Sequence, residues 1–441
     1  MIQEREYKKR RDTLGKKLSN NSIGVIFSAE YTTRSHDTQH PYRQNSNFYY
    51  LTGFKEDNAA LVFIKKKKSV KTALFVQKKD EQLELWTGKR LGKKKAKKRF
   101  LVDKVYVNDD FKKRIKEFIK DKNSLYCDLN SKSGDVKKIL KLTKDFEIKE
   151  DITKLIQKMR LIKSLSEIEL IKESVAITAK AHERAMKLDK RGKYEYELQA
   201  EIEHEFKKNA TYSDAYTSIV ACGNSANTLH YIKNDQPLND GELVLIDAGC
   251  EHNYYASDIT RTIPVDGKFS QPQKELYNLV LETQLAIIDM IKPGVMRTHL
   301  QETAEEMLTK GMIELGILKG DYKRLIKEKK HKKYYPHGIG HWMGIDVHDP
   351  APYRDAKNNE IPLGEGMILT IEPGLYIGKN DKAVPKKYRG IGIRIEDDIL
   401  VTKEGCENLS FSIAKTVEEI EGFVTAVKES CCLVVAVTPT C

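Results

Sequence analysis

The chain has 441 residues, of which 40% are hydrophobic and 32% are charged, and its formal net charge is +13. This length exceeds one ordinary core, so we expect two domains, and the composition excludes a disordered chain. A basic chain can bind nucleic acid, but the lysine runs at 65–68 and 93–99 lack interleaved aromatic residues and no nucleic-acid-binding signature occurs. We interpret the lysines as solvated surface and expect no nucleic acid partner.

The seven cysteines are scattered without a CxxC pair, which is typical of reduced thiols in a cytoplasmic protein. The first residues, MIQEREYKKRRDTL, are charged throughout and lack the apolar segment of a signal peptide. No window reaches the roughly 18 apolar residues of a membrane span, so we expect no membrane association. The apolar end, residues 431–441, is too short to span a bilayer, and we assign it no function.

The first third of the chain alternates predicted helices and strands, which indicates a mixed α/β domain over residues 1–155. In its hairpin, the KKKKSVK turn is expected to present its lysines to water. The predicted elements are a helix over 2–19, a strand over 22–28, a hairpin over 59–77, a helix over 111–122 and a strand over 124–128.

From residue 160 the pattern changes to long helices and antiparallel strands, which predicts an α+β domain over residues 160–430. The first helix has an S-x-x-E start signal in Ser166 and Glu169, which predicts a capping box. The predicted helices are 161–188, 195–208, 273–291 and 299–315, with strand patterns between them from Thr217 onwards.

The segment GELVLIDAGCEHNYYASDITRT places Asp247 at the end of an apolar strand. A buried carboxylate there is unfavourable unless it is paired or bound to a cation. If the chain makes a two-residue hairpin at His252 and Asn253, Asp258 lies directly opposite Asp247 on the same face. The two carboxylates would repel each other, and a cation between them would remove the conflict. The alternative is an ion pair between Asp258 and Arg261.

The segment HGIGHWMGIDVHD contains His337, His341 and His348, which are three of the eleven histidines. The spacing of the first two would suit a zinc-binding helix, but the glycines among them make a helix unfavourable. We therefore expect a loop or strand whose backbone comes close to a ligand. The clustering favours a functional role over isolated core histidines.

Two further carboxylates lie on strand-like segments. Glu372 ends the apolar run of MILTIEPGLYI, and in GIGIRIEDDI Arg394 and Glu396 share one strand face while isoleucines occupy the other. A salt bridge from Arg394 to a carboxylate is the alternative interpretation of that pair. With Asp247, Asp258 and His341, these residues form a thiol-free set that suits Mn²⁺, Co²⁺, Fe²⁺ or Zn²⁺, and four carboxylates carry enough charge for two such ions.

In chain order, IDAG(x)₈DITRT, HGIGHWMGIDVHD, TIEPGLY and GIRIEDD resemble the pita-bread metallopeptidases, which include aminopeptidase P, prolidase and methionine aminopeptidase, with creatinase as a metal-free relative. YRQNSNFYYLTGF (residues 42–54) and TLHY (228–231) resemble aminopeptidase P in particular. The resemblance covers residues 1–428. It implies an aminopeptidase P-like N-terminal domain followed by a catalytic pita-bread domain. The large N-terminal domain argues against a methionine aminopeptidase.

The resemblance also implies roles for the five ligands. Asp247 would chelate one metal ion, Asp258 and Glu396 would bridge both ions, and His341 and Glu372 would bind the other. A hydroxide between the ions would be the nucleophile. Glu372 would in addition relay its proton to the leaving nitrogen.

Around these ligands, the resemblance implies that His348 and His230 steady the scissile carbonyl and the tetrahedral intermediate. His337, Arg394 and Tyr376 would contact the substrate. The implied reaction removes an N-terminal residue that precedes proline, with two divalent ions as cofactors, manganese first and cobalt, zinc or iron as alternatives. The expected partners are peptides with proline at the second position and further copies of the chain, as a dimer or tetramer. A prolidase, or a non-catalytic binding protein on the same fold, stays as the alternative, although such binding relatives lose metal ligands.

Overall fold

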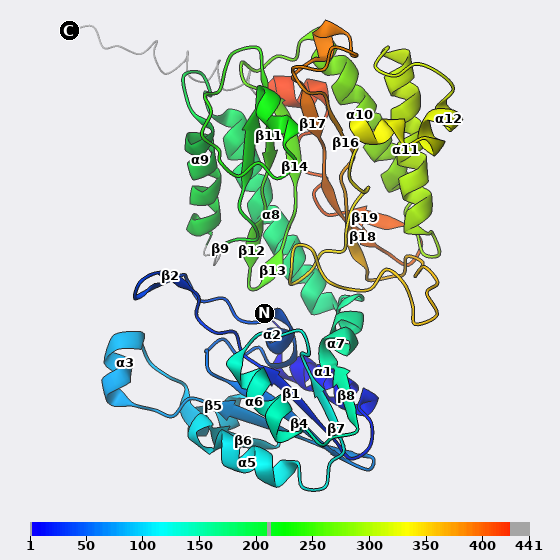
Figure 1. Ribbon diagram of the computed structural model, residues 1–441. Helices are drawn as coiled ribbons and strands as arrows, with labels where there is room; N and C mark the ends of the chain where they lie inside the picture. The colour runs from blue at the N-terminus through cyan, green and yellow to red at the C-terminus, as the bar shows by residue number, and fades with distance from the viewer. Residues whose placement is uncertain (1, 210–212, 424–441) are drawn as a thin grey trace, which may run out of the picture. The chain divides into compact units, whose positions relative to one another are not determined.

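The computed structural model describes residues 2–209 and 213–423, and the chain divides into two compact units, Met1–Arg160 and Leu161–Cys441 (Figure 1). None of the helices in the described stretches combines the length and the apolar character that a bilayer crossing requires. The end for which we predict no function, residues 431–441, lies outside the described residues.

The first unit is built on a mixed six-stranded sheet with the strand order β6-β5-β4-β1-β7-β8. Its central strand β1 pairs antiparallel with β4 and parallel with β7, and β2 and β3 form a separate hairpin. The strands are β1 (Ser22–Phe27), β2 (Thr33–Ser35), β3 (Thr38–Gln39), β4 (Ala60–Lys66), β5 (Ser69–Val76), β6 (Lys104–Val107), β7 (Ser124–Cys127) and β8 (Ile148–Asp151).

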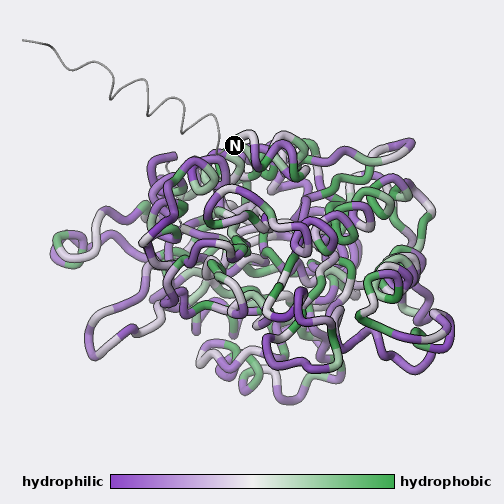
Figure 2. Tube along the Cα trace, turned by 90° about the horizontal axis from the view of Figure 1, so that it is seen from above, coloured by the Kyte–Doolittle hydropathy of each residue, from purple (hydrophilic) through white to green (hydrophobic). Residues whose placement is uncertain are grey.

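Helices cover both faces of this sheet, which explains why its central strands are apolar along most of their length. On one face, alternate residues such as Val25, Val62 and Phe75 pack against Ile115 of α5 and Ile139 of α6. The peripheral loops are mostly hydrophilic (Figure 2). The helices are α1 (Glu4–Lys17), α2 (Ser46–Thr52), α3 (Glu81–Thr87), α4 (Gly92–Arg99), α5 (Phe111–Phe118), α6 (Gly134–Leu142) and α7 (Ile152–Arg160).

One lysine of the predicted β4–β5 turn does not face water. Lys65 is buried, and its ammonium group donates to the carbonyl oxygens of Gly15 (3.1 Å), Lys16 (3.0 Å) and Leu18. The last carbonyl groups of a helix have no partners within the helix, so Lys65 supplies the donors that the C-terminus of α1 needs. The prediction that the lysines of this hairpin are all solvated is therefore wrong for Lys65.

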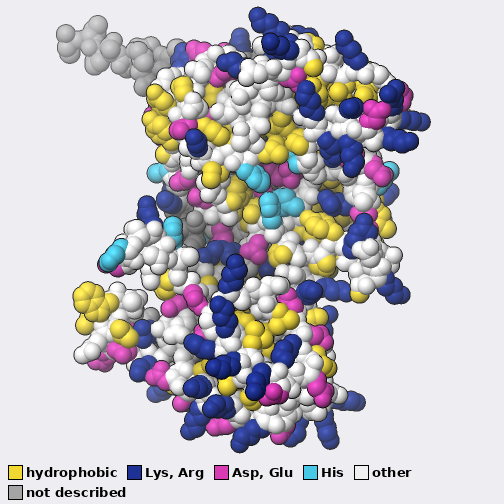
Figure 3. Space-filling model, viewed as in Figure 1, with side chains coloured by type: hydrophobic (Ala, Val, Ile, Leu, Met, Phe, Trp, Pro, Cys, Tyr) yellow, Lys and Arg dark blue, Asp and Glu magenta, His cyan; other side chains and the backbone are white. Residues whose placement is uncertain are grey.

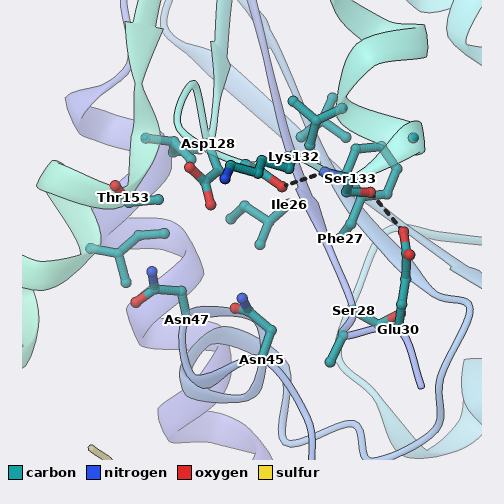
Figure 4. Close-up of a pocket in the computed structure, with 17 residues that line it drawn as sticks. Ile26, Phe27, Ser28, Glu30, Asn45, Asn47, Asp128, Lys132, Ser133 and Thr153 are labelled. Carbon is teal, nitrogen blue, oxygen red and sulfur yellow. Dashed lines mark hydrogen bonds between the residues drawn. The ribbon is translucent and has the colours of Figure 1, made fainter. Parts of the chain in front are cut away.

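A cavity of about 440 Å³ lies at the carboxyl ends of β1 and β7. Asp128 and Lys132 lie on one side of it and Asn45 and Asn47 on the other (Figure 4). Polar groups around it have protein partners: Asp128 accepts the Asn130 N–H at 3.0 Å, and Asn47 accepts a guanidinium N–H within the same unit at 2.9 Å. These groups are satisfied without a ligand.

The second unit contains most of the long helices. The first, α8, begins with a capping box formed by Ser164 and Glu167, not by Ser166 and Glu169 as predicted. The backbone N–H of Glu167 donates to the Ser164 hydroxyl, and the Glu167 carboxylate accepts the Ser164 N–H at 2.9 Å. The helices are α8 (Leu165–Lys187), α9 (Glu195–Lys208), α10 (Gln271–Asp289), α11 (Arg297–Glu314) and α12 (Tyr322–Lys327).

The strands of the second unit form several small antiparallel sheets, with the orders β10-β11-β14, β13-β12-β9, β15-β18-β19 and β16-β17. Helices α8 and α9 contact the earlier strands and α10 contacts the later ones (Figure 1). The strands are β9 (Ser213–Asp214), β10 (Ile219–Cys222), β11 (Leu243–Asp247), β12 (Cys250–His252), β13 (Tyr255–Ala256), β14 (Thr260–Pro264), β15 (Ile368–Ile371), β16 (Gly374–Tyr376), β17 (Gly392–Arg394), β18 (Asp397–Val401) and β19 (Cys406–Asn408).

Replacing Lys65 with methionine is expected to lower the free energy of unfolding by about 1–3 kcal/mol, because three carbonyl groups at the end of α1, two of them in buried hydrogen bonds, lose their donor. Lys68→Met, at an exposed position of the same hairpin, is the matched control and should change it by less than about 0.5 kcal/mol. Urea unfolding followed by circular dichroism measures both. Equal stability of the two variants would contradict the capping role.

Candidate metal centre

A short hairpin positions the first two predicted ligands. Asp247 ends β11, and Asp258 lies between β13 and β14. The hairpin turns at Asn253 and Tyr254, which both adopt left-handed backbone conformations, and not at His252 and Asn253 as the sequence predicted. Each residue of the hairpin therefore pairs with a residue two positions further along the chain than the sequence predicted.

Asp247 therefore lies opposite Thr260, and the prediction that it faces Asp258 directly is wrong. Moving a turn by one residue moves the cross-strand partner by two, and two residues along a strand return to the same face. Asp258 thus remains on the face of Asp247 in a diagonal position. The Tyr216 hydroxyl contacts both, at 2.6 Å from Asp247 Oδ1 and 2.5 Å from Asp258 Oδ1.

The alternative ion pair between Asp258 and Arg261 does not form. The Arg261 guanidinium is buried against Asp397, with Nη2 at 2.8 Å from Oδ1, and it also donates to the carbonyl oxygen of Glu396 at 2.7 Å. The Asp258 carboxylate instead lies 3.2 Å from Nε2 of His341. Arg261 therefore stabilises the framework and leaves Asp258 available to the cluster.

His341 lies on an extended segment that adds to the edge of β15. The Thr370 N–H donates to the His341 carbonyl at 2.9 Å, and the Glu372 N–H donates to the Ile339 carbonyl at 2.8 Å. Gly340 allows this approach, because a Cβ there would lie 1.8 Å from the Thr370 carbonyl oxygen. The predicted absence of a helix is confirmed, but Gly340 makes room for neighbouring backbone and not for a ligand.

Glu372 directly follows β15, and Glu396 lies between β17 and β18, where it forms a bridge with Thr260. The Thr260 hydroxyl donates to Oε2 of Glu396 at 2.7 Å, which orients that carboxylate. Arg394 pairs with Asp247, with Nη2 at 2.5 Å from Oδ2, so the predicted alternative salt bridge is present. One guanidinium cannot neutralise four carboxylates, so the ion pair and a cation site are compatible.

Potential ligand atoms of the cluster fall into three overlapping groups, within each of which they lie within 4.8 Å of one another: Asp247, Asp258 and Glu396; His341, Glu372 and Glu396; and Asp258, His341 and His348. They line a cavity of about 510 Å³. Histidine and acidic side chains gather on this face of the second unit, whereas lysine and arginine side chains are spread over the surface (Figure 3). The structure thus brings the five predicted ligands together.

The other predicted site residues lie around the same cavity. His230, His337, His348 and Arg394 line it, and the ring centroids of His341 and His348 are 4.2 Å apart. Tyr376 connects two of them, because its hydroxyl lies 2.8 Å from Nε2 of His337 and accepts an N–H from Arg394 at 3.0 Å.

Burial and mutual repulsion disfavour the charged forms of the carboxylates. Burial raises the pKa of Asp247, although the charge of Arg394 opposes the shift. Burial and the nearby charge of Asp258 hold the pKa of Glu396 well above its ordinary value, and burial raises the pKa of Glu372 to about 7. These carboxylates are poised to release protons when a cation binds.

The histidines differ in their charge. Burial opposes protonation of His341, but its hydrogen bond to Asp258 and the neighbouring negative charges raise its pKa to about 9. Burial and the charge of Arg394 lower the pKa of His337 to about 4, and burial lowers the pKa of His348. His341 therefore carries a proton where a metal ion would otherwise bind, while His337 and His348 are neutral near pH 7.

Two polar residues of the site were missed by the sequence reasoning. Tyr216 bonds two carboxylates, but it lies after a short strand with no motif around it. Asp398 accepts the backbone N–H of Asp258 at 3.0 Å, so it fixes the strand that carries this ligand. The repeated acidic residues of GIGIRIEDDI could have indicated Asp398, whereas no local signal indicates Tyr216.

The donor set fits divalent cations. Four carboxylates and one imidazole converge, and two carboxylates compete for the single hydroxyl proton of Tyr216. A cation among these oxygen atoms would relieve the repulsion that, after burial, raises the pKa values, and oxygen atoms with one imidazole suit borderline-hard divalent metals.

Sequence comparison finds two families. Residues 169–403 match "Metallopeptidase family M24", and residues 7–126 match "Aminopeptidase P, N-terminal domain". The chain is 40% identical to an Xaa-Pro aminopeptidase of Haemophilus influenzae over 96% of this chain and 98% of that protein. It is 39% identical to the Xaa-Pro aminopeptidase of Escherichia coli over 97% and 99% of the two chains.

Solved structures give the same result. Zinc-substituted E. coli aminopeptidase P in complex with product has a TM-score of 0.93 and 38% identity, covering 97% of this chain and 99% of that chain. The low-pH form of the same protein has a TM-score of 0.94. The predicted order of an aminopeptidase P-like N-terminal domain and a C-terminal pita-bread domain is confirmed.

Replacing Gly340 with alanine is expected to lower the free energy of unfolding by about 1–3 kcal/mol and to reduce bound metal, because the new methyl group displaces the His341 segment from β15. Gly338→Ala is the matched control, since a Cβ there meets nothing nearer than 3.7 Å. Thermal unfolding and metal analysis by mass spectrometry measure both effects. If both variants keep metal and stability, the constraint assigned to Gly340 is wrong.

Proposed function

Because the chain belongs to metallopeptidase family M24, we propose that it is a metal-dependent aminopeptidase that hydrolyses the bond between an N-terminal residue and a following proline. The observation that carries the proposal is the convergence of four carboxylates and one imidazole on one cavity of the second unit. Similarity to Xaa-Pro aminopeptidases over nearly the whole chain supports the substrate class. The catalytic domain would span residues 160–430, after an N-terminal domain over 1–155.

Two divalent ions would be held by the five ligands, with Asp247 on one ion, His341 and Glu372 on the other, and Asp258 and Glu396 bridging. Glu396 belongs both to the group with Asp247 and to the group with His341 and Glu372, and Asp258 belongs both to the group with Asp247 and to a group with His341, which supports bridging roles for these two carboxylates. When bound, such ions polarise the scissile carbonyl and lower the pKa of a water molecule towards neutrality. We favour manganese, with cobalt, zinc or iron as alternatives.

Proton transfer is assigned to Glu372. As a carboxylate that lines the cavity beside the proposed ions, Glu372 would accept a proton from the attacking water and pass it to the leaving nitrogen. The leaving nitrogen of an Xaa–Pro bond is a tertiary amide without its own hydrogen, so it must receive a proton to leave. Glu372 lines the cavity directly after β15, where it would reach both the attacking water and the leaving nitrogen.

Two histidines are proposed to act on the carbonyl. His348 and His230 line the cavity, and the low pKa of His348 leaves a neutral imidazole that can donate one N–H to the developing oxyanion. His337, Arg394 and Tyr376 form a linked polar wall through the hydroxyl of Tyr376, which would contact the substrate after the scissile bond.

We further propose a cytoplasmic homo-oligomer, a dimer or tetramer. The four cysteines in the described part of the chain are free thiols, which supports a reducing compartment.

Substrate length separates this proposal from a prolidase. Purified chain loaded with Mn²⁺ should release the first residue from Xaa–Pro–Yaa tripeptides, and an excess of chelator should abolish the release. Xaa–Ala–Yaa peptides serve as the control for the proline requirement. Chromatographic detection of free Xaa gives the rates. Cleavage of Xaa–Pro dipeptides alone would move the assignment to a prolidase, and undiminished activity without metal would refute the proposed chemistry.

Glu372→Gln is expected to reduce kcat by about 10²–10⁴-fold, because the amide cannot accept the proton that the carboxylate transfers. Glu365→Gln, an exposed position just before β15, is the matched control and should retain full activity. Rates are measured at saturating Mn²⁺ with the metal content determined in parallel, so that loss of metal is recognised separately. A Glu372→Gln variant with wild-type kcat would remove Glu372 from the mechanism.

A further inference from the structure

A loop of six residues separates Trp342 from Asp349, and its two ends lie beside two of the four histidines of the candidate site, His341 and His348. The Asp349 N–H donates to the Trp342 carbonyl at 2.8 Å, which closes the loop. His341 precedes Trp342 and His348 precedes Asp349, so this bond sets the separation of the two imidazoles, whose centroids lie 4.2 Å apart. Any displacement of Asp349 therefore moves His348 relative to the metal ligands.

Asp349 forms a buried ion pair with Lys163. Lys163 Nζ lies 3.4 Å from Asp349 Oδ2, and each side chain is only 1% exposed. The backbone of Lys163 is itself fixed, because its N–H donates to the carbonyl of Gly366 at 2.8 Å. The Lys163 ammonium group thus holds the Asp349 carboxylate from a backbone that is bonded to the segment before β15. Neither residue of the pair lines the candidate pocket.

The loop is shaped to receive this pair. A Cβ at Gly344 would lie 2.8 Å from Asp349 Oδ2 and 3.1 Å from Lys163 Cε, so the ion pair occupies the space beside a glycine. The Gly344 carbonyl accepts the N–H of Ala256 at 2.9 Å, two residues before Asp258. The same loop is therefore joined to the hairpin that carries the predicted bridging ligand.

A buried ion pair contributes little net stability over apolar side chains of similar size, because desolvation offsets the attraction. The ion pair instead restrains position, because the fixed Lys163 ammonium group holds the side chain of Asp349, whose backbone N–H closes the loop. We propose that Lys163, through Asp349, is a positioning residue that holds the His348 imidazole in place for the reaction. The proposal rests on the catalytic role of His348 given above.

The kinetic test compares Lys163→Met with Lys172→Met in the full chain. Lys172 lies on α8 and pairs with Glu407 at the exposed surface, so its variant is the matched control and should keep wild-type kinetics. Lys163→Met should lower kcat for an Xaa–Pro–Yaa tripeptide by roughly 10- to 100-fold, with KM and metal content near the wild-type values. In a His348→Ala background the same substitution should add less than about twofold, because the two changes act on one group.

If Lys163→Met lowers kcat by the same factor in the His348→Ala background as in the wild type, the proposal is overturned. It is also overturned if Lys163→Met lowers only the thermal stability and keeps its kcat. If Lys163→Met does not fold, the double variant Lys163→Met/Asp349→Asn removes both charges and replaces it in each comparison. The double variant is expected to show the same loss of kcat, and wild-type kcat in it would overturn the proposal.

A second readout does not depend on peptidase activity. The chain is labelled with ¹³C at histidine Cε1 and loaded with diamagnetic Zn²⁺, and the His348 signal is assigned by its disappearance in His348→Ala. Lys163→Met, or the double variant, should shift or broaden this signal, and Lys172→Met should leave it unchanged. An unmoved His348 signal would refute the positioning role even if the chain cleaves no peptide. If the wild-type chain cleaves no Xaa–Pro peptide but Lys163→Met still displaces the His348 signal, only the proposed function is refuted.

Discussion

Mutual repulsion among buried carboxylates is the constraint on which the second unit depends. Asp247, Asp258, Glu372 and Glu396 come from separate strand ends, and their ligand atoms approach to within a few ångströms in overlapping groups. Left alone, such groups take up protons, as the raised pKa values of Asp247, Glu372 and Glu396 indicate. The surrounding strands oppose this repulsion through backbone contacts, which are the bridge between Thr260 and Glu396 and the pairing of the His341 segment with β15 that Gly340 permits.

The two arginines of the site region neutralise different carboxylates. Arg394 pairs with Asp247 inside the cavity, whereas Arg261 pairs with Asp397 behind it. Asp397 directly follows Glu396, so the alternation of side chains along the strand directs one carboxylate to the cluster and the next to the framework. The pKa values of the two carboxylates shift in opposite directions. The charges of Arg261 and Lys415 overcome the effect of burial and hold the pKa of Asp397 well below its ordinary value. Burial and the neighbouring carboxylates hold the pKa of Glu396 well above its ordinary value. On one face of the strand the protein itself supplies the balancing cations, and on the other the excess of carboxylates favours a bound cation.

The places of Asp247 and Glu372 in the candidate site were predictable from the sequence because each lies where an apolar strand ends, and burial of a carboxylate at such a position requires a partner. Details of register were not predictable. The hairpin turn includes Tyr254 in a left-handed conformation, which is unusual for an aromatic residue, so the sequence predicts the turn one residue too early. The segment SLSEIE contains two overlapping S-x-x-E signals, and only the packing of α8 selects Ser164 over Ser166. Lys65 and Tyr216 make their contacts with residues distant in sequence, where no local pattern reports them.

Size does not distinguish the cavity of the candidate site from the other cavity described above. The two have similar volumes, about 510 and 440 Å³, and both lie at strand ends. The difference is the balance of charge and hydrogen bonding. Around the cavity of the first unit, polar groups such as Asp128 and Asn47 accept hydrogen bonds from neighbouring N–H groups, so an empty cavity costs little. In the second unit, the fold holds four carboxylates around one guanidinium and one imidazole, an arrangement whose negative charge exceeds what the protein supplies in return. This excess of negative charge distinguishes the second cavity from the first and supports a cation site there.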